Sequence, residues 1–325
     1  MHELAPPLRG RTRHPNAPEK TMHVAVSGSS GLIGTALCQS LVRSGHQVSK
    51  LVRRTATRPD EVPWDPSAGT LDPAALEGTD AVVNLSGAGI GDKRWTDAYK
   101  RELLDSRVAT TSLLADTIAR MDRKPQVFLS GSAVGIYGER GDQALTEQSD
   151  AGSGFLADIC RQWEDATTAA SEAGVRVAHL RTGVVLADRG GALGKMLPLF
   201  RFGLGGKMGN GRAYWSWISL ADEVGAIEFL LEQPVSGAVN LTAPAPATNA
   251  EFTKALGQAL HRPTLLPVPS FGPKLLLGGE LADALLFTSA RVVPQVLLDA
   301  GYRFRHPALA SAFHSVLGGA TAAAS

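Results

Sequence analysis

The chain has 325 residues, enough for one large domain or two small ones, and its 44% hydrophobic and 19% charged residues are ordinary for a globular enzyme. The formal net charge of +1 gives no electrostatic reason to expect nucleic acid or an anionic membrane as a partner, and no apolar run reaches membrane-spanning length. The two cysteines, Cys38 and Cys160, lie far apart, which favours reduced thiols in a cytoplasmic protein over a disulfide framework.

Residues 1–21 are predicted to form a disordered tail, because prolines interrupt them, arginines keep them polar and no secretory apolar segment is present. Their arginine content would also suit an organelle transit peptide, although the prolines disfavour an amphipathic helix. From residue 22 onward strands and helices alternate, which predicts an α/β fold with a doubly wound parallel sheet. We expect a dinucleotide-binding domain over 22–240 and a smaller helical substrate lobe over 241–325, with part of that lobe near 187–218.

The predicted elements follow from hydrophobic periodicity and from turn residues. In chain order they begin with strand 24–27, helix 35–44, strands 47–52 and 81–85, helix 95–120, strand 127–130, helix 155–173 and strand 176–180. They continue with helix 193–202, a glycine-rich loop over 203–211, strand 214–218, helix 220–231, strand 238–241, a helix from Asn249 as N-cap to His261, an apolar segment over 275–287 and helices 294–300 and 307–317.

Three glycines spaced G-x-x-G-x-x-G stand between the first strand and the first helix. Gly28 permits a sharp turn, Gly31 lets backbone N–H groups approach a pyrophosphate, and Gly34 lets the helix pack against the strand. The helix then directs its positive N-terminal end toward the anion. This arrangement predicts a dinucleotide site rather than an unliganded turn.

The end of the second strand favours one dinucleotide over the other. An acidic residue about 20 positions after the glycines usually binds the adenosine ribose, but here Arg53 and Arg54 stand at that point and the next acid is Asp60. Two guanidiniums suit a 2′-phosphate, so NADP(H) is predicted in preference to NAD(H).

Further motifs follow the later strands: N-L-S-G over 84–87, S-G-S-A-V-G-I-Y-G over 130–138 and L-R-T-G-V-V-L over 180–186. Together with the glycine loop, they make residues 22–317 resemble the extended, NAD(P)-dependent epimerase/dehydratase branch of the short-chain dehydrogenase/reductase superfamily. Within it, the chain looks like an epimerase-like group of which some members are labelled cell division inhibitor. The resemblance implies cofactor contacts at Gly28, Ser29, Ser30, Gly31, Leu32, Ile33, Gly34, Arg53, Arg54, Leu85, Ser86, Gly87 and Ser130, with the nicotinamide near Ser132, Arg181 and Gly183.

The superfamily's catalytic device is a Ser or Thr, a Tyr, and a Lys four residues after that Tyr. Ser132 matches the Ser, but no tyrosine of this chain is followed by Lys at that spacing. Tyr137 and Cys160 are the candidate replacements, each more often a packing residue, and Glu164 lies one helical turn beyond Cys160. The histidines show no metal-ligand spacing, so no metal is expected.

Two functions remain open at this point. One is an NADP(H)-binding, epimerase-like oxidoreductase with an atypical proton donor, acting on an unknown small carbonyl or sugar-like substrate. The other is a non-catalytic NADP(H)-binding redox sensor that presents a surface to a regulatory partner. The resemblance also suggests a homodimer formed through the helices predicted at 95–120 and 155–173.

Overall fold

A seven-stranded sheet forms the centre of the molecule. The structure is a computed structural model that describes residues 21–265 and 267–322, so almost all of the tail predicted over 1–21 lies outside the described residues. The strand order is β11-β7-β5-β4-β1-β2-β3, and every neighbouring pair is parallel, which confirms the predicted doubly wound sheet. The strands are β1 His23–Ser27, β2 Gln47–Val52, β3 Glu61–Pro63, β4 Ala81–Asn84, β5 Val127–Ala133, β7 Arg176–Thr182 and β11 Gly237–Leu241.

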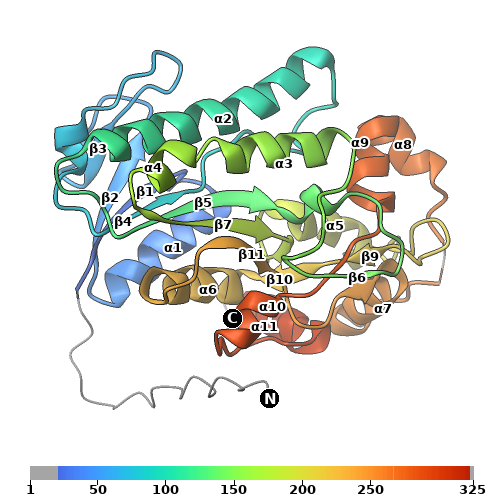
Figure 1. Ribbon diagram of the computed structural model, residues 1–325. Helices are drawn as coiled ribbons and strands as arrows, with labels where there is room; N and C mark the ends of the chain where they lie inside the picture. The colour runs from blue at the N-terminus through green and yellow to red at the C-terminus, as the bar shows by residue number, and fades with distance from the viewer. Residues whose placement is uncertain (1–20, 266, 323–325) are drawn as a thin grey trace, which may run out of the picture.

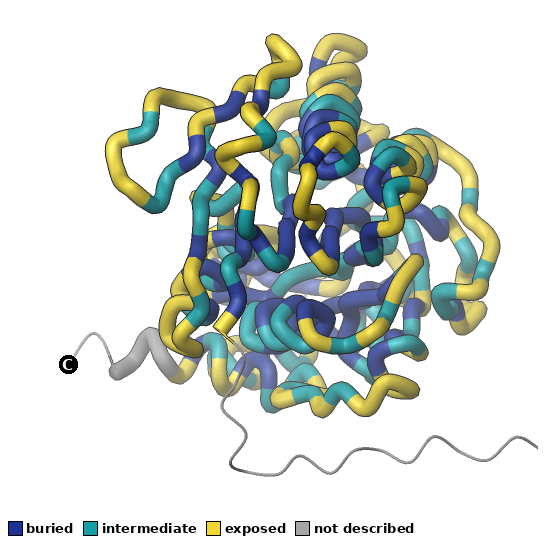
Figure 2. The backbone as a smooth tube through the Cα atoms, turned by 60° about the vertical axis from the view of Figure 1, so that its left-hand side comes forward, coloured by how far each residue is buried: buried dark blue, intermediate teal, exposed yellow. Residues whose placement is uncertain are grey.

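Helices cover both faces of this sheet (Figure 1). One face packs on α1 Leu32–Arg43 and α6 Leu220–Glu232, and the other on α2 Asp97–Arg120, α3 Phe155–Asp165 and α4 Thr168–Glu172. Successive strand residues point to opposite faces, so Val24 and Val26 join the α1 and α6 side while Ala25 joins the α2 side. The central strands β1, β4 and β5 are therefore almost entirely buried, as the dark tube at the centre of Figure 2 shows, whereas β2 and β3 at one edge are partly exposed.

A smaller lobe packs around Trp217, Phe252 and Phe313, which are all fully buried. Its helices are α5 Gly191–Arg201, α7 Asn249–Leu260 and α11 Leu309–Ala322, and its strand pairs are β8 Val184–Leu186 with β10 Trp217–Ser219 and β9 Tyr214–Trp215 with β12 Ala247–Thr248. The other elements are η1 Pro73–Leu76, η2 Val134–Tyr137, β6 Ala144–Leu145 paired with β13 Arg291–Val292, α8 Phe271–Leu277, α9 Gly279–Ala282, η3 Asp283–Phe287 and α10 Gln295–Asp299. The domain division proposed from the sequence stays a prediction.

Two predicted elements are interrupted in the structure. The helix predicted over 155–173 is the separate helices α3 and α4, because Thr167 Oγ1 donates to the Glu164 carbonyl and Thr168 Oγ1 donates to the Asp165 carbonyl where the helix breaks. The strand predicted over 214–218 is β9 and β10, which pair with different strands on either side of Ser216.

Asn249 was expected to cap α7, and this expectation is wrong. Thr248 is the N-cap, since its hydroxyl accepts from the backbone N–H of Glu251, whose carboxylate in turn accepts from the backbone N–H of Thr248. Asn249 is the first helical residue, and its Oδ1 accepts instead from the Met208 backbone N–H at 2.7 Å. A capping box is favoured by the Glu three residues after Thr248, a signal that was present in the sequence.

Candidate functional site

The turn between β1 and α1 brings backbone groups together where side chains would collide. Gly28 has a φ of 66°, and a Cβ atom there would lie 2.5 Å from the Leu85 carbonyl oxygen of the chain after β4. A Cβ atom on Gly34 would lie 2.2 Å from the Gly28 carbonyl oxygen. Gly31 precedes α1 without a side-chain cap, and no acidic residue stands in the first turn, so the N–H groups of that turn can bind an anion.

Asn84 links the carboxyl ends of β1 and β4 next to the glycine turn. Its Oδ1 accepts from Ser27 Oγ at 2.5 Å and from the Ser86 N–H at 3.2 Å, and its Nδ2 donates to Thr111 Oγ1 at 2.8 Å. Trp163 Nε1 donates to the same Thr111 hydroxyl at 3.0 Å, which extends the network to α2 and α3. Asn84 belongs to the N-L-S-G motif but was not predicted as a site residue; the signal for it was an amide at the end of an otherwise apolar strand.

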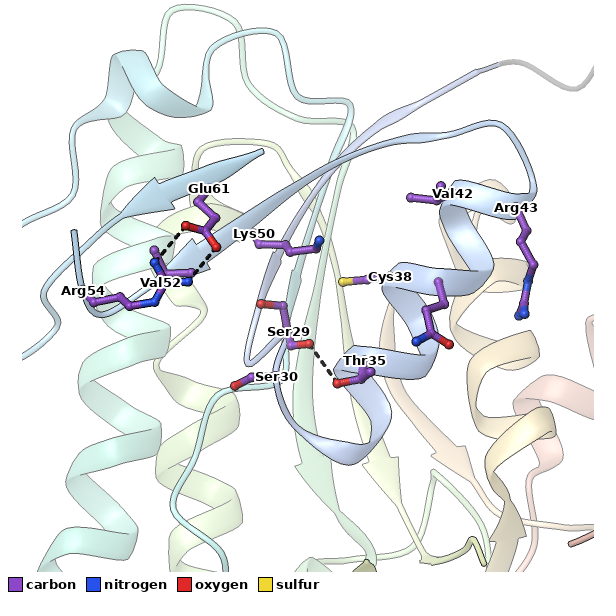
Figure 3. A pocket seen from close by; sticks show the side chains of 11 residues that line it. Ser29, Ser30, Thr35, Cys38, Val42, Arg43, Lys50, Val52, Arg54 and Glu61 are labelled. Atoms are coloured by element: carbon purple, nitrogen blue, oxygen red, sulfur yellow. Dashed lines mark hydrogen bonds and ion pairs between the residues drawn. The ribbon is translucent and has the colours of Figure 1, made fainter. Parts of the chain in front are cut away.

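A pocket of about 520 Å³ opens beside the glycine turn, between α1 and the ends of β2 and β3. Figure 3 shows Ser29 and Ser30 on the loop before α1, with Lys50 and Arg54 on the opposite side. Both predicted serines therefore line it, and Leu32 and Ile33 begin the helix that forms its wall.

Arg54 forms an ion pair with Glu61 in this pocket. Its guanidinium donates to both oxygens of Glu61, at 2.6 and 2.9 Å, and the hydrogen bonds from Arg54 and the Thr57 N–H lower the pKa of Glu61 to about 2. Arg53 is exposed and forms no ion pair within residues 21–265 and 267–322. Glu61 was not predicted as a site residue because its strand, β3, was not predicted, and the contact joins β3 to the chain after β2.

A second polar network joins β5, α3 and β7 at the carboxyl end of the sheet. Ser132 Oγ donates to Glu164 Oε1 at 2.6 Å. Arg181 donates to both oxygens of the same carboxylate at 2.8 Å and, through its other terminal nitrogen, to the Tyr137 hydroxyl at 3.0 Å. The Tyr137 hydroxyl donates to Asn240 Oδ1 at 2.7 Å. Three residues chosen from the sequence, Ser132, Arg181 and Tyr137, thus meet through Glu164 and one another.

The ion pair with Arg181 determines the protonation state of Glu164. Burial by itself would raise the pKa of this carboxyl, but the hydrogen bonds from Arg181 and Ser132 outweigh burial and leave the pKa below its usual value. Glu164 is therefore an ionised carboxylate at neutral pH, held 2.6 Å from a serine hydroxyl. The arrangement can accept a proton through Ser132, as a general base does.

The other two candidate proton donors are buried, as Ser132 itself is. Tyr137 is fully buried, burial raises its pKa, and both contacts of its hydroxyl are with protein groups. Cys160 is buried as well, and burial raises the pKa of its thiol to about 11, so it is a protonated thiol at neutral pH.

Several predicted cofactor contacts surround the same end of the sheet. The Ser130 hydroxyl is buried with no hydrogen-bond partner, and Gly183 lies so close to Ser216 that a Cβ atom would be 2.6 Å from its carbonyl oxygen. Gly87 packs on the guanidinium of Arg107, which donates to the carbonyls of Leu103 and Ala88 and lies 5.0 Å from the centre of the Trp163 ring. Arg107 was not predicted as a site residue.

Glu223 is a further titratable group near this end of the sheet. It is fully buried in the first turn of α6, its Oε1 accepts from Thr182 Oγ1 at 2.8 Å, and its Oε2 has no partner. Burial raises its pKa from the usual 4.5 to about 8, so the protonated form predominates at neutral pH.

Residues 21–265 and 267–322 contain neither a metal-binding cluster nor a membrane-spanning helix. No group of three or more His, Cys, Asp and Glu side chains there is arranged to hold a metal ion. None of the helices in that part of the chain has the length and apolarity needed to cross a membrane.

Comparisons with known sequences identify relatives along nearly the whole chain. The NAD dependent epimerase/dehydratase family matches residues 24–242, and a domain of unknown function (DUF1731) matches residues 268–316. Epimerase family protein Mb2239 of Mycobacterium bovis is 47% identical over 89% of this chain and 95% of its own length. Human epimerase family protein SDR39U1 is 36% identical over 91% of this chain and 100% of its own length.

Solved structures of related epimerase-family proteins also match this chain. The crystal structure of human SDR39U1 (isoform 2) with NADPH matches with a TM-score of 0.84 and 35% identity, covering 91% of this chain and 99% of that one. A nucleoside-diphosphate sugar epimerase from Corynebacterium glutamicum matches with a TM-score of 0.76 and 37% identity, covering 92% of this chain and 59% of that one. UDP-glucose 4-epimerase from Thermotoga maritima, at 14% identity and a TM-score of 0.73, shares the fold.

The substitution Gly34→Ala should destabilise the protein by about 2 kcal/mol or more, because the added methyl group would collide with the backbone of Gly28. Urea denaturation measures the loss. The matched control is Gly194→Ala in α5, where the nearest atom would lie 3.4 Å away, an ordinary contact. An equal free energy of unfolding for the two variants would contradict the close approach at Gly34.

The substitution Glu223→Gln should make stability less sensitive to pH. Between the usual pKa of 4.5 and the raised value of about 8, the folded chain keeps a proton that the unfolded chain releases, so wild-type stability falls as pH rises. Compared with the variant, the free energy of unfolding of the wild-type protein should fall by up to about 1.4 kcal/mol per pH unit across that window. Thermal melts at pH 5 and pH 8 test this; a constant difference in Tm between the proteins would refute it.

Proposed function

The chain belongs to the NAD dependent epimerase/dehydratase family, and from that premise we propose that it is an NADP(H)-dependent oxidoreductase with an unusual proton-transfer pair. Ser132 and Glu164 would take the part played elsewhere in the superfamily by Tyr and Lys. The substrate class proposed is a small carbonyl or sugar-like compound. The observation that carries the proposal is the 2.6 Å hydrogen bond from Ser132 to an ionised carboxylate.

The residues around the glycine turn fit a dinucleotide. The α1 N-terminus offers free backbone N–H groups to a pyrophosphate, and the two close approaches at Gly28 and Gly34 leave room only for backbone. Arg53 and Arg54 would hold the 2′-phosphate of NADP(H), in keeping with the human relative crystallised with NADPH. When bound, the nicotinamide supplies or accepts a hydride.

The chain's own part in the reaction is proton transfer. As a substrate alcohol is oxidised, its hydroxyl proton passes to Ser132 Oγ while the Ser132 proton passes to Glu164 Oε1, and reduction of a carbonyl reverses both transfers. Arg181 keeps Glu164 ionised and fixes its position through two hydrogen bonds. Ser132 also polarises the substrate oxygen.

A second candidate function is a non-catalytic NADP(H)-binding sensor. It is favoured by the burial of all three donor candidates, Ser132, Tyr137 and Cys160, and by the raised pKa that keeps the Cys160 thiol protonated. In that case NADP(H) binding would order the surrounding loops and present them to a partner. Turnover of the bound cofactor separates the two functions.

Replacing Arg53 and Arg54 together by Ala should weaken NADPH binding by about tenfold or more and leave NADH binding nearly unchanged, because only NADPH carries the 2′-phosphate. Titration of cofactor fluorescence measures both affinities. Arg58→Ala is the matched control, an exposed arginine of the same loop that does not line the pocket. Tighter binding of NADH than NADPH by the wild-type protein would contradict the assignment.

Ser132→Ala and Glu164→Gln should each reduce turnover of NADP(H) with a panel of alcohols and carbonyls by about 100-fold, with NADPH affinity retained. Because the pKa of Glu164 is lowered, alcohol oxidation should stay constant from pH 8 to about pH 5 and fall only in acid. Asp165→Asn, an exposed carboxylate next along the chain, is the control and should be silent.

The two proposed functions give different outcomes in this experiment. Turnover that survives both substitutions would exclude the Ser132 and Glu164 pair. If no compound changes the redox state of bound NADP(H), the enzymatic function is wrong and the sensor function takes its place.

A further inference from the structure

Two segments of the smaller lobe lie side by side on its surface, at the right-hand end of the molecule in Figure 1. Residues 199–212 comprise the end of α5 and the loop after it, and residues 261–276 run from the end of α7 into α8. Arg262 Nε donates to the Arg201 carbonyl at 2.9 Å, and the Val268 N–H donates to the Lys207 carbonyl at 2.8 Å. We call these two segments, without residue 266, the basic apolar surface.

Large apolar side chains project from the basic apolar surface into solvent. Six of them are between 61% and 88% exposed: Phe202, Leu204, Leu265, Phe271, Leu275 and Leu276. Single exposed apolar residues are ordinary, but a concentration of this kind on adjoining segments marks an interaction site.

The charges on this surface have one sign. The two segments carry five Lys and Arg residues and no Asp or Glu, although the whole chain has a net charge of only +1. Lys274 pairs with Asp283, whereas the other four cations form no ion pair within residues 21–265 and 267–322. The flanking carboxylates are engaged, since Glu251 caps α7 and Glu280 pairs with Lys100 at 2.5 Å.

We propose that the basic apolar surface binds the face of an anionic lipid bilayer. The apolar side chains would enter the interface between headgroups and acyl chains, and Arg201, Lys207, Arg212 and Arg262 would contact lipid phosphates and carboxylates. A bilayer accepts protruding side chains without a matching concave surface, whereas a protein partner needs complementary shape. Binding of this kind lies on the membrane and requires no spanning helix.

Vesicle sedimentation with the full chain tests this proposal. The protein should bind phosphatidylcholine vesicles containing about 30% phosphatidylserine at least about tenfold more tightly than pure phosphatidylcholine vesicles. Raising NaCl from about 50 mM to about 500 mM should remove most of the difference, because salt screens the contacts with the headgroups.

Two double variants locate the interaction. Arg201→Glu with Lys207→Glu removes the positive charge, and Phe202→Ser with Leu275→Ser removes the apolar insertion; each should weaken binding by about tenfold. The charge control is Arg120→Glu with Arg123→Glu, two exposed arginines at the far end of α2, and the apolar control is Leu298→Ser in α10.

Every variant keeps the arginines of residues 1–21, so binding through that segment would be unchanged throughout the set. Equal binding to neutral and anionic vesicles, or wild-type binding by either test variant, would overturn the proposal. So would loss of self-association in the Phe202→Ser, Leu275→Ser variant with vesicle binding intact, since the surface would then join two copies of the chain. Circular dichroism melts confirm that each variant is folded.

Discussion

The close approach of backbone to backbone at the end of β1 is the constraint on which the rest of the site depends. Gly28 lies against the chain after β4, and Gly34 lies against Gly28, so neither position has space for a side chain. This packing brings the N-terminus of α1 to the point where the strand order reverses, between β1 and β4. Asn84 then fixes the two strand ends to each other through its amide.

Charge and hydrogen bonding organise the carboxyl ends of β5 and β7. The bidentate ion pair of Arg181 with Glu164 joins β7 to α3, and Ser132 adds β5 to the same carboxylate. A buried carboxylate left without its guanidinium would be costly, so the pair both orders the site and keeps Glu164 ionised. Glu223 illustrates the opposite case, because no cation of the described residues pairs with it and burial lets the same kind of side chain retain its proton.

The basic apolar surface of the smaller lobe carries a local positive charge that the net charge of the whole chain does not indicate. A net charge of +1 suggested no attraction to an anionic membrane, yet five cations and no carboxylates lie on two adjoining segments. The net charge does not say where the charged residues lie, whereas binding to an anionic surface depends on the local electrostatic potential.

By itself the sequence determined the alternation of strands and helices, the glycine turn before α1 and the absence of a Tyr followed four residues later by Lys. These features reside in short segments, where spacing and residue type act directly on the backbone. Only the tertiary structure decided that Glu164 meets Ser132 from 32 residues away and that Glu61 of β3 pairs with Arg54. It also decided that Glu223 pairs with no cation among the described residues. Such contacts depend on how separate elements pack, and local spacing does not specify which side chains they bring together.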